Sequence, residues 1–153
     1  MTEVNLKNIS EVRLIYQRKV KAEARPSITN SQTAYDLFRQ NWDDLTINLY
    51  EEFKILLLDR NNRCMGLSTV SIGGVSGTVV DPKLVFITAL KTRACGLIVA
   101  HNHPSGNLKA SNADVRLTKQ LKEAGKLLDL PLLDHLIVTD EHYISMSDEG
   151  LIP

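Results

Sequence analysis

The stretch VAHNHPSGNLKASNADVRLT, residues 99–118, carries two histidines at the end of an apolar run and an aspartate shortly after them. Residues i and i+2 of an extended strand point to the same face, so His101 and His103 are predicted to direct both imidazoles to one point. Ser111 is predicted to begin the next helix, with Asp114 in its first turn. Two imidazoles and a carboxylate that converge in this way supply three zinc ligands and leave a fourth position for water, which is typical of catalytic zinc.

The same residues also have structural interpretations. Ser111 and Asp114 make a good helix start without any metal, because the serine caps the helix and the aspartate favours its dipole. A single histidine beside a strand is more often a hydrogen-bonded structural residue than a ligand. His101 and His103 together, followed by the serine and the aspartate in this order, favour metal binding. The donor set predicts zinc, one ion per chain, and it also suits iron or nickel.

Composition limits the classes of function. The chain has 153 residues, of which 43% are hydrophobic, enough to bury one sizeable core. Its 18 basic residues balance 18 acidic ones, so the overall charge does not support nucleic-acid binding. The first 20 residues carry charges throughout and lack a long apolar run, which argues against a secretory signal or membrane span and predicts a cytoplasmic protein. The two cysteines, Cys64 and Cys95, form no metal motif and are predicted to be free thiols.

The rest of the sequence predicts alternating strands and helices. The predicted elements are a strand over 11–20, a helix over 32–42 capped by Ser31, a strand, turn and strand over 51–74 with the turn at 60–63, a helix that starts at Asp81 and Pro82 and ends just before Gly96, a buried strand over 97–100, an amphipathic helix over 112–130 and a hairpin around Asp140 and Glu141. This alternation predicts an α/β fold with helices around one mixed sheet. Trp42 is predicted to pack in the core.

The histidine stretch also carries a family resemblance. The segment HNHPSGNLKASNAD resembles the JAMM motif of JAB (also called MPN) metalloprotease domains, and AHNHPSG with DHLIV downstream is similar to the RadC branch. The resemblance runs from about residue 28 to 150 and includes VVDPKLVFITAL. It implies a RadC-like MPN domain over residues 28–153, with a mixed sheet flanked by helices in a cytidine deaminase-like layout. Residues 1–27 are expected to be an N-terminal strand and lead-in to the same domain.

The resemblance implies a zinc-dependent hydrolase that attacks a peptide or isopeptide amide bond. It assigns Glu52, immediately before Phe53, as the general acid and base that takes a proton from water and returns it to the leaving nitrogen. Glu51 beside it is a competitor for this role. Ser111 is assigned to the oxyanion of the tetrahedral intermediate, although it is also the predicted helix cap.

Three further residues are candidates for supporting the ligands. Asn102 and Ser105 are expected at the rim of the site, with a positioning role or none. His135 is expected to contact a ligand rather than to serve as a fourth ligand. DHLIV, which contains His135, also fits a strand that is simply anchored by hydrogen bonds.

Two other functions compete with the hydrolase. Full-length RadC relatives carry a helix-hairpin-helix region before this domain, whereas fewer than thirty residues precede the resemblance here. The alternative is a RadC-family DNA repair or recombination module that binds through protein or nucleic-acid contacts and has a structural or vestigial metal site. A zinc deaminase is disfavoured because the chain has no PCxxC motif. The expected partner is a peptide-like substrate, with no membrane; the oligomeric state stays open.

Overall fold

The computed structural model describes residues 8–13, 15–74 and 77–153. In chain order the elements are the 3₁₀ turn η1 (Ala22–Ala24), α1 (Ser31–Gln40), β1 (Glu52–Leu58), β2 (Cys64–Ile72), α2 (Pro82–Lys91), β3 (Gly96–Asn102), α3 (Asn112–Leu127), β4 (Leu132–Val138) and β5 (Tyr143–Ser145). The strands form one sheet in the order β2-β1-β3-β4-β5. β3 and β4 are parallel and the other neighbours are antiparallel, so the predicted mixed sheet is confirmed.

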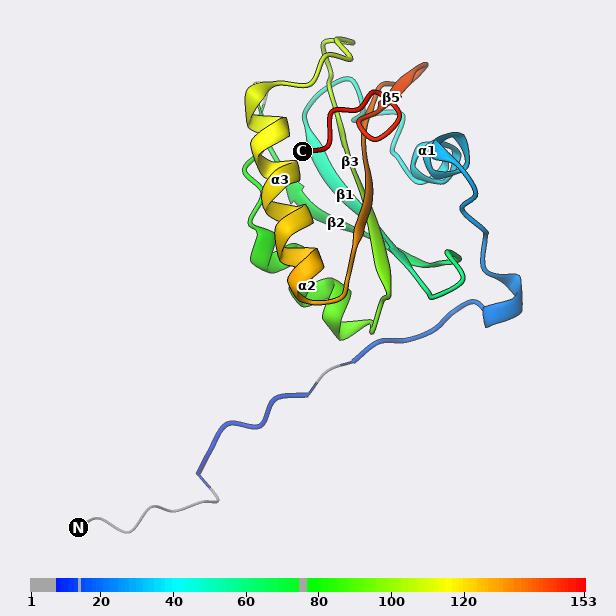
Figure 1. The fold of residues 1–153 in the computed structure, drawn as a ribbon, viewed down its shortest axis with the longest axis vertical. Coiled ribbons are helices and arrows are strands. Elements are labelled where there is room, and N and C mark those ends of the chain that lie inside the picture. The colour runs from blue at the N-terminus through cyan, green and yellow to red at the C-terminus, as the bar shows by residue number, and fades with distance from the viewer. Residues whose placement is uncertain (1–7, 14, 75–76) are drawn as a thin grey trace, which may run out of the picture.

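Helices cover both faces of this sheet (Figure 1), with α1 on one face and α2 and α3 on the other. All residues of β1 and β3 are buried, because both of their faces are covered. Side chains alternate along a strand, so even-numbered residues of β1 and β3, such as Leu56 and Ala100, pack on the α1 face. Odd-numbered residues, such as Ile55 and Val99, pack on the α3 face. This parity decides which polar side chains can meet.

The start of α3 agrees with the prediction. The Ser111 hydroxyl accepts from the backbone N–H of Asp114 at 3.0 Å, and the Asp114 carboxylate accepts from the backbone N–H of Ser111 at 2.8 Å. This reciprocal capping box satisfies two N–H groups that a helix leaves unpaired at its start. The helix direction, and with it the position of Asp114, is therefore fixed at the first turn.

Two other helix boundaries correct the predictions. α1 begins one residue early, because the side chain of Asn30, not of Ser31, accepts from the backbone N–H of Thr33 at 2.9 Å. α2 ends at Lys91, well before Gly96, because the chain turns there through Arg93, whose φ of 58° is left-handed. Gly96 is instead the first residue of β3. Asp81 caps α2 as predicted.

The predicted hairpins are confirmed at both ends of the sheet. Between β1 and β2 the Asp59 carboxylate accepts from the backbone N–H groups of Asn61 (2.9 Å) and Arg63 (3.0 Å), which holds the turn closed. Between β4 and β5 the backbone of Thr139 donates to His142 at 2.8 Å. Trp42 is buried, and the two cysteines are free, as predicted.

The predicted strand over 11–20 is wrong for residues 11–13 and 15–20, which form no ladder; Leu14 lies outside the described residues. Val12 is 83% exposed, whereas a half-buried strand would cover it. Residues 8–13 and 15–20 pair with no strand, and their contact with the sheet is the Tyr16 hydroxyl, which donates to the carbonyl of Met65 on β2 at 3.0 Å. The chain joins the sheet edge at 26–28 (Figure 1), where Cys64 N–H donates to the carbonyl of Pro26 at 2.8 Å. Alternating residues alone do not make a strand without a partner. Within the described ranges, no helix is long and apolar enough to cross a membrane.

Candidate metal centre

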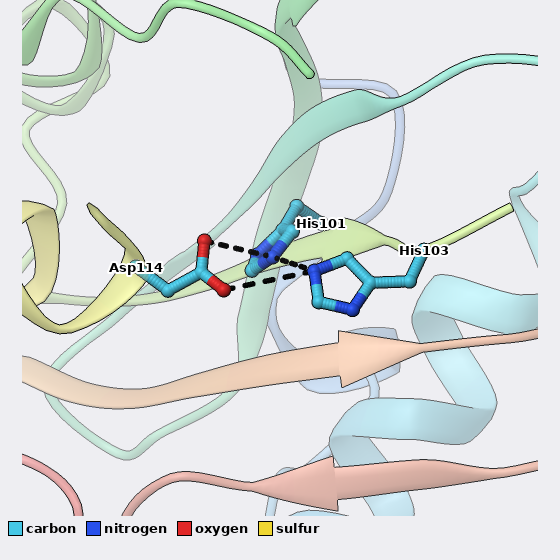
Figure 2. A group of neighbouring side chains, drawn as sticks. All are labelled: His101, His103 and Asp114. Atoms are coloured by element: carbon cyan, nitrogen blue, oxygen red, sulfur yellow. Dashed lines mark hydrogen bonds and ion pairs between the residues drawn. The ribbon is translucent and has the colours of Figure 1, made fainter. Parts of the chain in front are cut away.

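The three predicted ligands meet at the end of β3 (Figure 2). His101 Nε2 lies 2.9 Å from His103 Nε2 and 3.2 Å from Asp114 Oδ1. His103 Nε2 lies 3.6 Å from Asp114 Oδ2. His101 comes from β3, His103 follows the strand directly, and Asp114 reaches across from the first turn of α3. In the described part of the chain, these residues form the group of histidine, cysteine and acidic side chains able to hold one metal ion.

The spacing of these atoms fits zinc. Ligand atoms at the usual zinc distances and at tetrahedral angles lie about 3.3 Å apart. The observed separations of 2.9, 3.2 and 3.6 Å lie on both sides of this value. The Nδ1 atom of His103, on the ring side away from Asp114, lies 2.5 Å from the backbone carbonyl of Asn107. A carbonyl can only accept, so this nitrogen must donate. A neutral His103 therefore carries its proton on Nδ1 and presents a bare Nε2 toward the other two ligands.

The charges of the site compensate one another in the metal-free chain. Burial favours the neutral form of Asp114, but hydrogen bonds from His101 and His103 and the charge of His101 outweigh it and hold the pKa of the carboxyl far below its ordinary value. Burial lowers the pKa of His103, yet contact with Asp114, the Asn107 carbonyl and the charge of Glu51 together raise it above the ordinary value. In the metal-free chain the Asp114 carboxylate thus favours a positive charge between itself and the two imidazoles.

His135 supports His101 from behind. It lies on β4 opposite Val99, is fully buried, and places its Nε2 2.7 Å from His101 Nδ1. Burial, with the charge on His101, holds the pKa of His135 well below its ordinary value. Because His135 contacts the Nδ1 side of the His101 ring, it faces away from the point where the three ligands converge. The structure therefore places His135 beside a ligand and not among the ligands.

Thr118 completes this contact, and the sequence analysis missed it. Its hydroxyl lies 2.6 Å from His135 Nδ1 and 2.6 Å from the backbone carbonyl of Asp114. Thr118 stands four residues after Asp114 on α3, so both face the sheet. The only signal in the sequence is a threonine at this i+4 position among apolar residues, which by itself predicts an ordinary helix residue.

The structure does not bring Glu52 to the metal ligands. As an even-numbered residue of β1, Glu52 faces α1, where its carboxylate lies 3.8 Å from the buried amine of Lys54. Lys54 in turn lies over the ring of Trp42, at 5.0 Å from its centroid. Strand alternation therefore separates the expected acid and base from the centre that it was expected to serve.

Glu51 is on the correct side. Phe53 pairs directly with His101 in the antiparallel β1–β3 ladder, so two residues back along β1 the same face points toward His103. The charge of Glu51 contributes to the raised pKa of His103. Glu51 immediately precedes β1, is half-buried and keeps access to solvent.

Asn102 does not line the rim of the site as expected. It is fully buried on the α1 face, where its side-chain NH₂ donates to the carbonyls of Ile47 (2.7 Å) and Tyr50 (2.9 Å). Its side-chain oxygen accepts from the backbone N–H of Glu52 at 2.7 Å. One amide thus ties the end of β3 to the segment that leads into β1. Because Asn102 holds the backbone of Glu52, we expect it to fix the position of the neighbouring Glu51 as well.

The two serines differ. Ser111 stands at the start of α3 and is exposed, and its oxygen accepts from Asp114 N–H. Among the described residues none accepts its hydroxyl hydrogen, so capping leaves that hydrogen available to a ligand. Ser105 accepts from the backbone N–H of Asn107 at 3.3 Å and closes its own turn without contacting the ligands.

A hollow adjoins the candidate ligand Asp114. It has a volume of about 530 Å³ and lies between α3 and the segment 78–80. Asp114 and Leu117 line it from the helix, and Val80 lines it from the opposite side. The hollow therefore offers space for an extended chain next to the converging ligands.

Comparison with known proteins gives curated relatives from several bacteria. A UPF0758 protein of Flavobacterium johnsoniae is 44% identical over 124 residues, which cover 81% of this chain and 53% of that protein. A UPF0758 protein of Alkaliphilus metalliredigens is 35% identical over 141 residues, covering 87% of this chain and 60% of that protein. A UPF0758 protein of Thermosynechococcus vestitus is 43% identical over 105 residues, covering 69% and 42%. The chain spans about half the length of these relatives.

A family profile agrees with the fold and with the position of the ligands. The profile of the family described as RadC-like JAB domain matches residues 28–151. This range begins where the chain joins the sheet edge, and it contains α1, all five strands, α2 and α3. It therefore contains the complete candidate metal centre. On these matches, the chain belongs to the family of RadC-like JAB domains.

Proposed function

We propose that this protein is a zinc-dependent hydrolase of the JAMM type that cleaves a peptide or isopeptide amide bond. His101, His103 and Asp114 hold the metal in this proposal. The observation that carries it is the convergence of two imidazole Nε2 atoms and one carboxylate within 3.6 Å of one another. Three protein ligands leave a position open for water, whereas structural zinc sites use four.

Zinc held by these residues would lower the pKa of a bound water to about 7 and would polarise a carbonyl group. We assign the acid and base role to Glu51 in place of Glu52. The Glu51 carboxylate accepts the proton that water releases on adding to the amide carbon, and it returns that proton to the nitrogen as the carbon–nitrogen bond breaks. Its face of the sheet and its influence on His103 support this assignment.

Ser111 supplies the hydroxyl that steadies the oxyanion. Its oxygen is used in capping α3, and its hydrogen remains available for a negatively charged oxygen. The hollow between α3 and segment 78–80 receives the chain on one side of the scissile bond. Its lining combines apolar side chains, such as Val80 and Leu117, with polar ones such as Arg116, which suits both the side chains and the backbone of a peptide.

Metal content is the first test. Untagged protein purified without chelator is expected to contain about one zinc per chain, and Asp114→Ala is expected to contain none. The wild type is then incubated with peptide and isopeptide libraries, and new amine ends are measured. Zinc without cleavage of any amide would favour the binding module over the hydrolase. Failure to bind zinc even when it is supplied would overturn the metal site itself.

A further inference from the structure

We infer that Thr118 and His135 act as positioning residues that set the tautomer of His101 before any metal arrives. The inference rests on the metal site of the proposed function, but not on the reaction. Three hydrogen bonds link the backbone of one ligand, Asp114, to the ring of another, His101. We call this chain from Asp114 carbonyl through Thr118 and His135 to His101 the tautomer relay.

The direction of the relay follows from its fixed end. A carbonyl oxygen only accepts, so the hydroxyl hydrogen of Thr118 points to the Asp114 carbonyl at 2.6 Å. The Met146 sulfur, at 3.6 Å from this hydroxyl, can also only accept. If the hydroxyl donated to it instead, the hydrogen would again be unavailable to His135. In both cases the Thr118 oxygen must accept from His135. The proton of a neutral His135 therefore sits on Nδ1.

The second half of the relay follows in the same way. With its proton on Nδ1, His135 presents a bare Nε2 to His101 at 2.7 Å. Two bare nitrogens do not bond, so His101 must carry its own proton on Nδ1 and donate it to His135. The His101 Nε2 that faces Asp114 is then free to bind a metal. The Nδ1 proton of His103 is fixed in the same way by the carbonyl of Asn107, and in the zinc-free chain the 2.9 Å contact between the two Nε2 atoms needs one further proton, in the place that a metal would take.

The two ligands are thus preset by different means. His103 uses a local carbonyl four residues away, which is exposed. His101 uses a buried relay across three elements, β3, β4 and α3. A metal-binding histidine commonly donates to a carboxylate or a carbonyl, and an imidazole in that place adds no negative charge. The net charge of a zinc site with these ligands therefore stays positive, which favours polarisation of a substrate oxygen.

The first test reads the tautomers directly. Nitrogen-15 NMR of the full chain, zinc-free and at about pH 9 where histidine is normally neutral, distinguishes protonated from bare ring nitrogens. The expected result is a proton on Nδ1 of both His101 and His135, unchanged after zinc is added. A proton on His135 Nε2 in the zinc-free protein, moving to Nδ1 only on zinc addition, would overturn the inference. This measurement needs no variant and no substrate.

The second test uses a matched pair of variants. Thr118→Val keeps the shape of the side chain and removes the hydroxyl, while Thr118→Ser keeps the hydroxyl. In Thr118→Val the proton of His135 is no longer directed to Nδ1, so the NMR spectrum is expected to show both His135 tautomers. Zinc affinity, measured by competition with a coloured chelator, is expected to fall about 10- to 100-fold. Thr118→Ser is expected to restore both readouts.

The outcomes separate the relay from the hydrolase. One outcome is that the wild type has the preset tautomers, Thr118→Val binds zinc more weakly, and the wild type cleaves no amide. This outcome would uphold the relay and refute the hydrolase. Wild-type cleavage together with unchanged tautomers and zinc affinity in Thr118→Val would refute the relay and leave the hydrolase standing. Circular dichroism checks that both variants fold. If Thr118→Val does not fold, the wild-type spectra still decide.

Discussion

The two faces of the sheet use neighbouring residues for opposite purposes at the end where β1 begins and β3 ends. On the α3 face, the Nε2 atoms of His101 and His103 converge on the carboxylate of Asp114, and the charge of Glu51 raises the pKa of His103. On the α1 face, Asn102 and Glu52 are buried and bind other parts of the chain. The difference teaches that a binding site needs polar atoms that can still bind a ligand. The scaffold instead uses polar atoms that already bind other parts of the chain.

The α1 face buries two charged side chains, Lys54 and Glu52, and their desolvation costs free energy. Lys54 is 6% exposed and donates to the Thr69 hydroxyl at 2.7 Å, while one carboxylate oxygen of its neighbour Glu52 has no hydrogen-bond partner among the described residues. A buried ion pair of this kind adds little net stability, because desolvation offsets the attraction. Its effect is to fix the start of β1 on the α1 side. The preceding residue, Glu51, to which we assign the acid and base role, falls on the α3 side by strand alternation.

The largest expected effect is the loss of zinc when one of the proposed ligands on the α3 face is removed. His101→Ala is expected to lose stoichiometric zinc and all zinc-dependent cleavage, because two ligands do not hold the ion against a chelator. Elemental analysis after dialysis measures the metal. His142→Ala, at an exposed turn, is the matched control and should keep its zinc. Equal zinc in both variants would contradict the assigned ligand set.

Substituting each of the two glutamates in turn tests which face of the sheet supplies the acid and base. Glu51→Gln is expected to retain zinc and lose about 10²- to 10⁴-fold in the rate of amide cleavage, because the proton acceptor is removed. Glu52→Gln should cleave within a few-fold of the wild type at a temperature at which both are folded. Steady-state rates on one peptide substrate measure both. The reverse order of effects would return the acid and base role to Glu52.

Asn102 tests the connection between the faces. Asn102→Ala leaves the Glu52 N–H and two carbonyls without partners, so the free energy of unfolding is expected to fall by about 1–3 kcal/mol. Urea unfolding measures it, with the exposed Gln40→Ala as the control. Cleavage should also slow in Asn102→Ala while zinc is kept, because Glu51 loses its fixed position. Unchanged cleavage would show that β1 is placed by other contacts.

The smallest expected effect is a pH dependence in the zinc-free protein. The lowered pKa of Asp114 contributes stability that is present above the ordinary aspartate pKa and is lost as the pH falls. The raised pKa of His103 contributes stability that is present below the ordinary histidine pKa and is lost as the pH rises through the raised value. Both contributions are complete between about pH 4 and pH 6.5.

In that window, Asp114→Asn is therefore expected to cost the zinc-free protein about 1 kcal/mol more than it costs at about pH 9. Thermal unfolding of both proteins in chelator across this pH range measures the difference. Thr118→Ser, which keeps every charge, serves as the control. A penalty for Asp114→Asn that does not change with pH would mean that the carboxylate contributes only by capping α3.

The ligands were predictable from sequence because their signals are local. Alternation places His101 and His103 on one side of a strand, and the capping box places Asp114 in the first turn of α3. The choice between Glu51 and Glu52 was not predictable in this way, because one residue of register reverses the face, and the register depends on pairing with β3, whose residue Asn102 binds the backbone of Glu52 from fifty positions away. Thr118 became visible only when β4 brought His135 against α3.

The same distinction explains the error near the N-terminus. Residues 11–20 alternate in hydrophobicity, but a strand also needs a neighbouring strand with free backbone groups. In the described part of the N-terminal segment, the short stretch around Ser27 finds one, at Arg63 on the edge of the sheet. The sequence pattern describes what a segment is able to do, and the pairing decides which of these structures forms.

The parallel pairing of β3 and β4 has a consequence for the order of folding. His101 and His135 are 34 residues apart and become neighbours only after α3 crosses between the two strands. Closing so large a loop is slow compared with forming a helix or a hairpin. During refolding, His101 and His103 are available early, whereas the set that includes Asp114 and His135 is complete only when the crossover docks. Uptake of zinc would therefore mark the last stage of folding rather than start it.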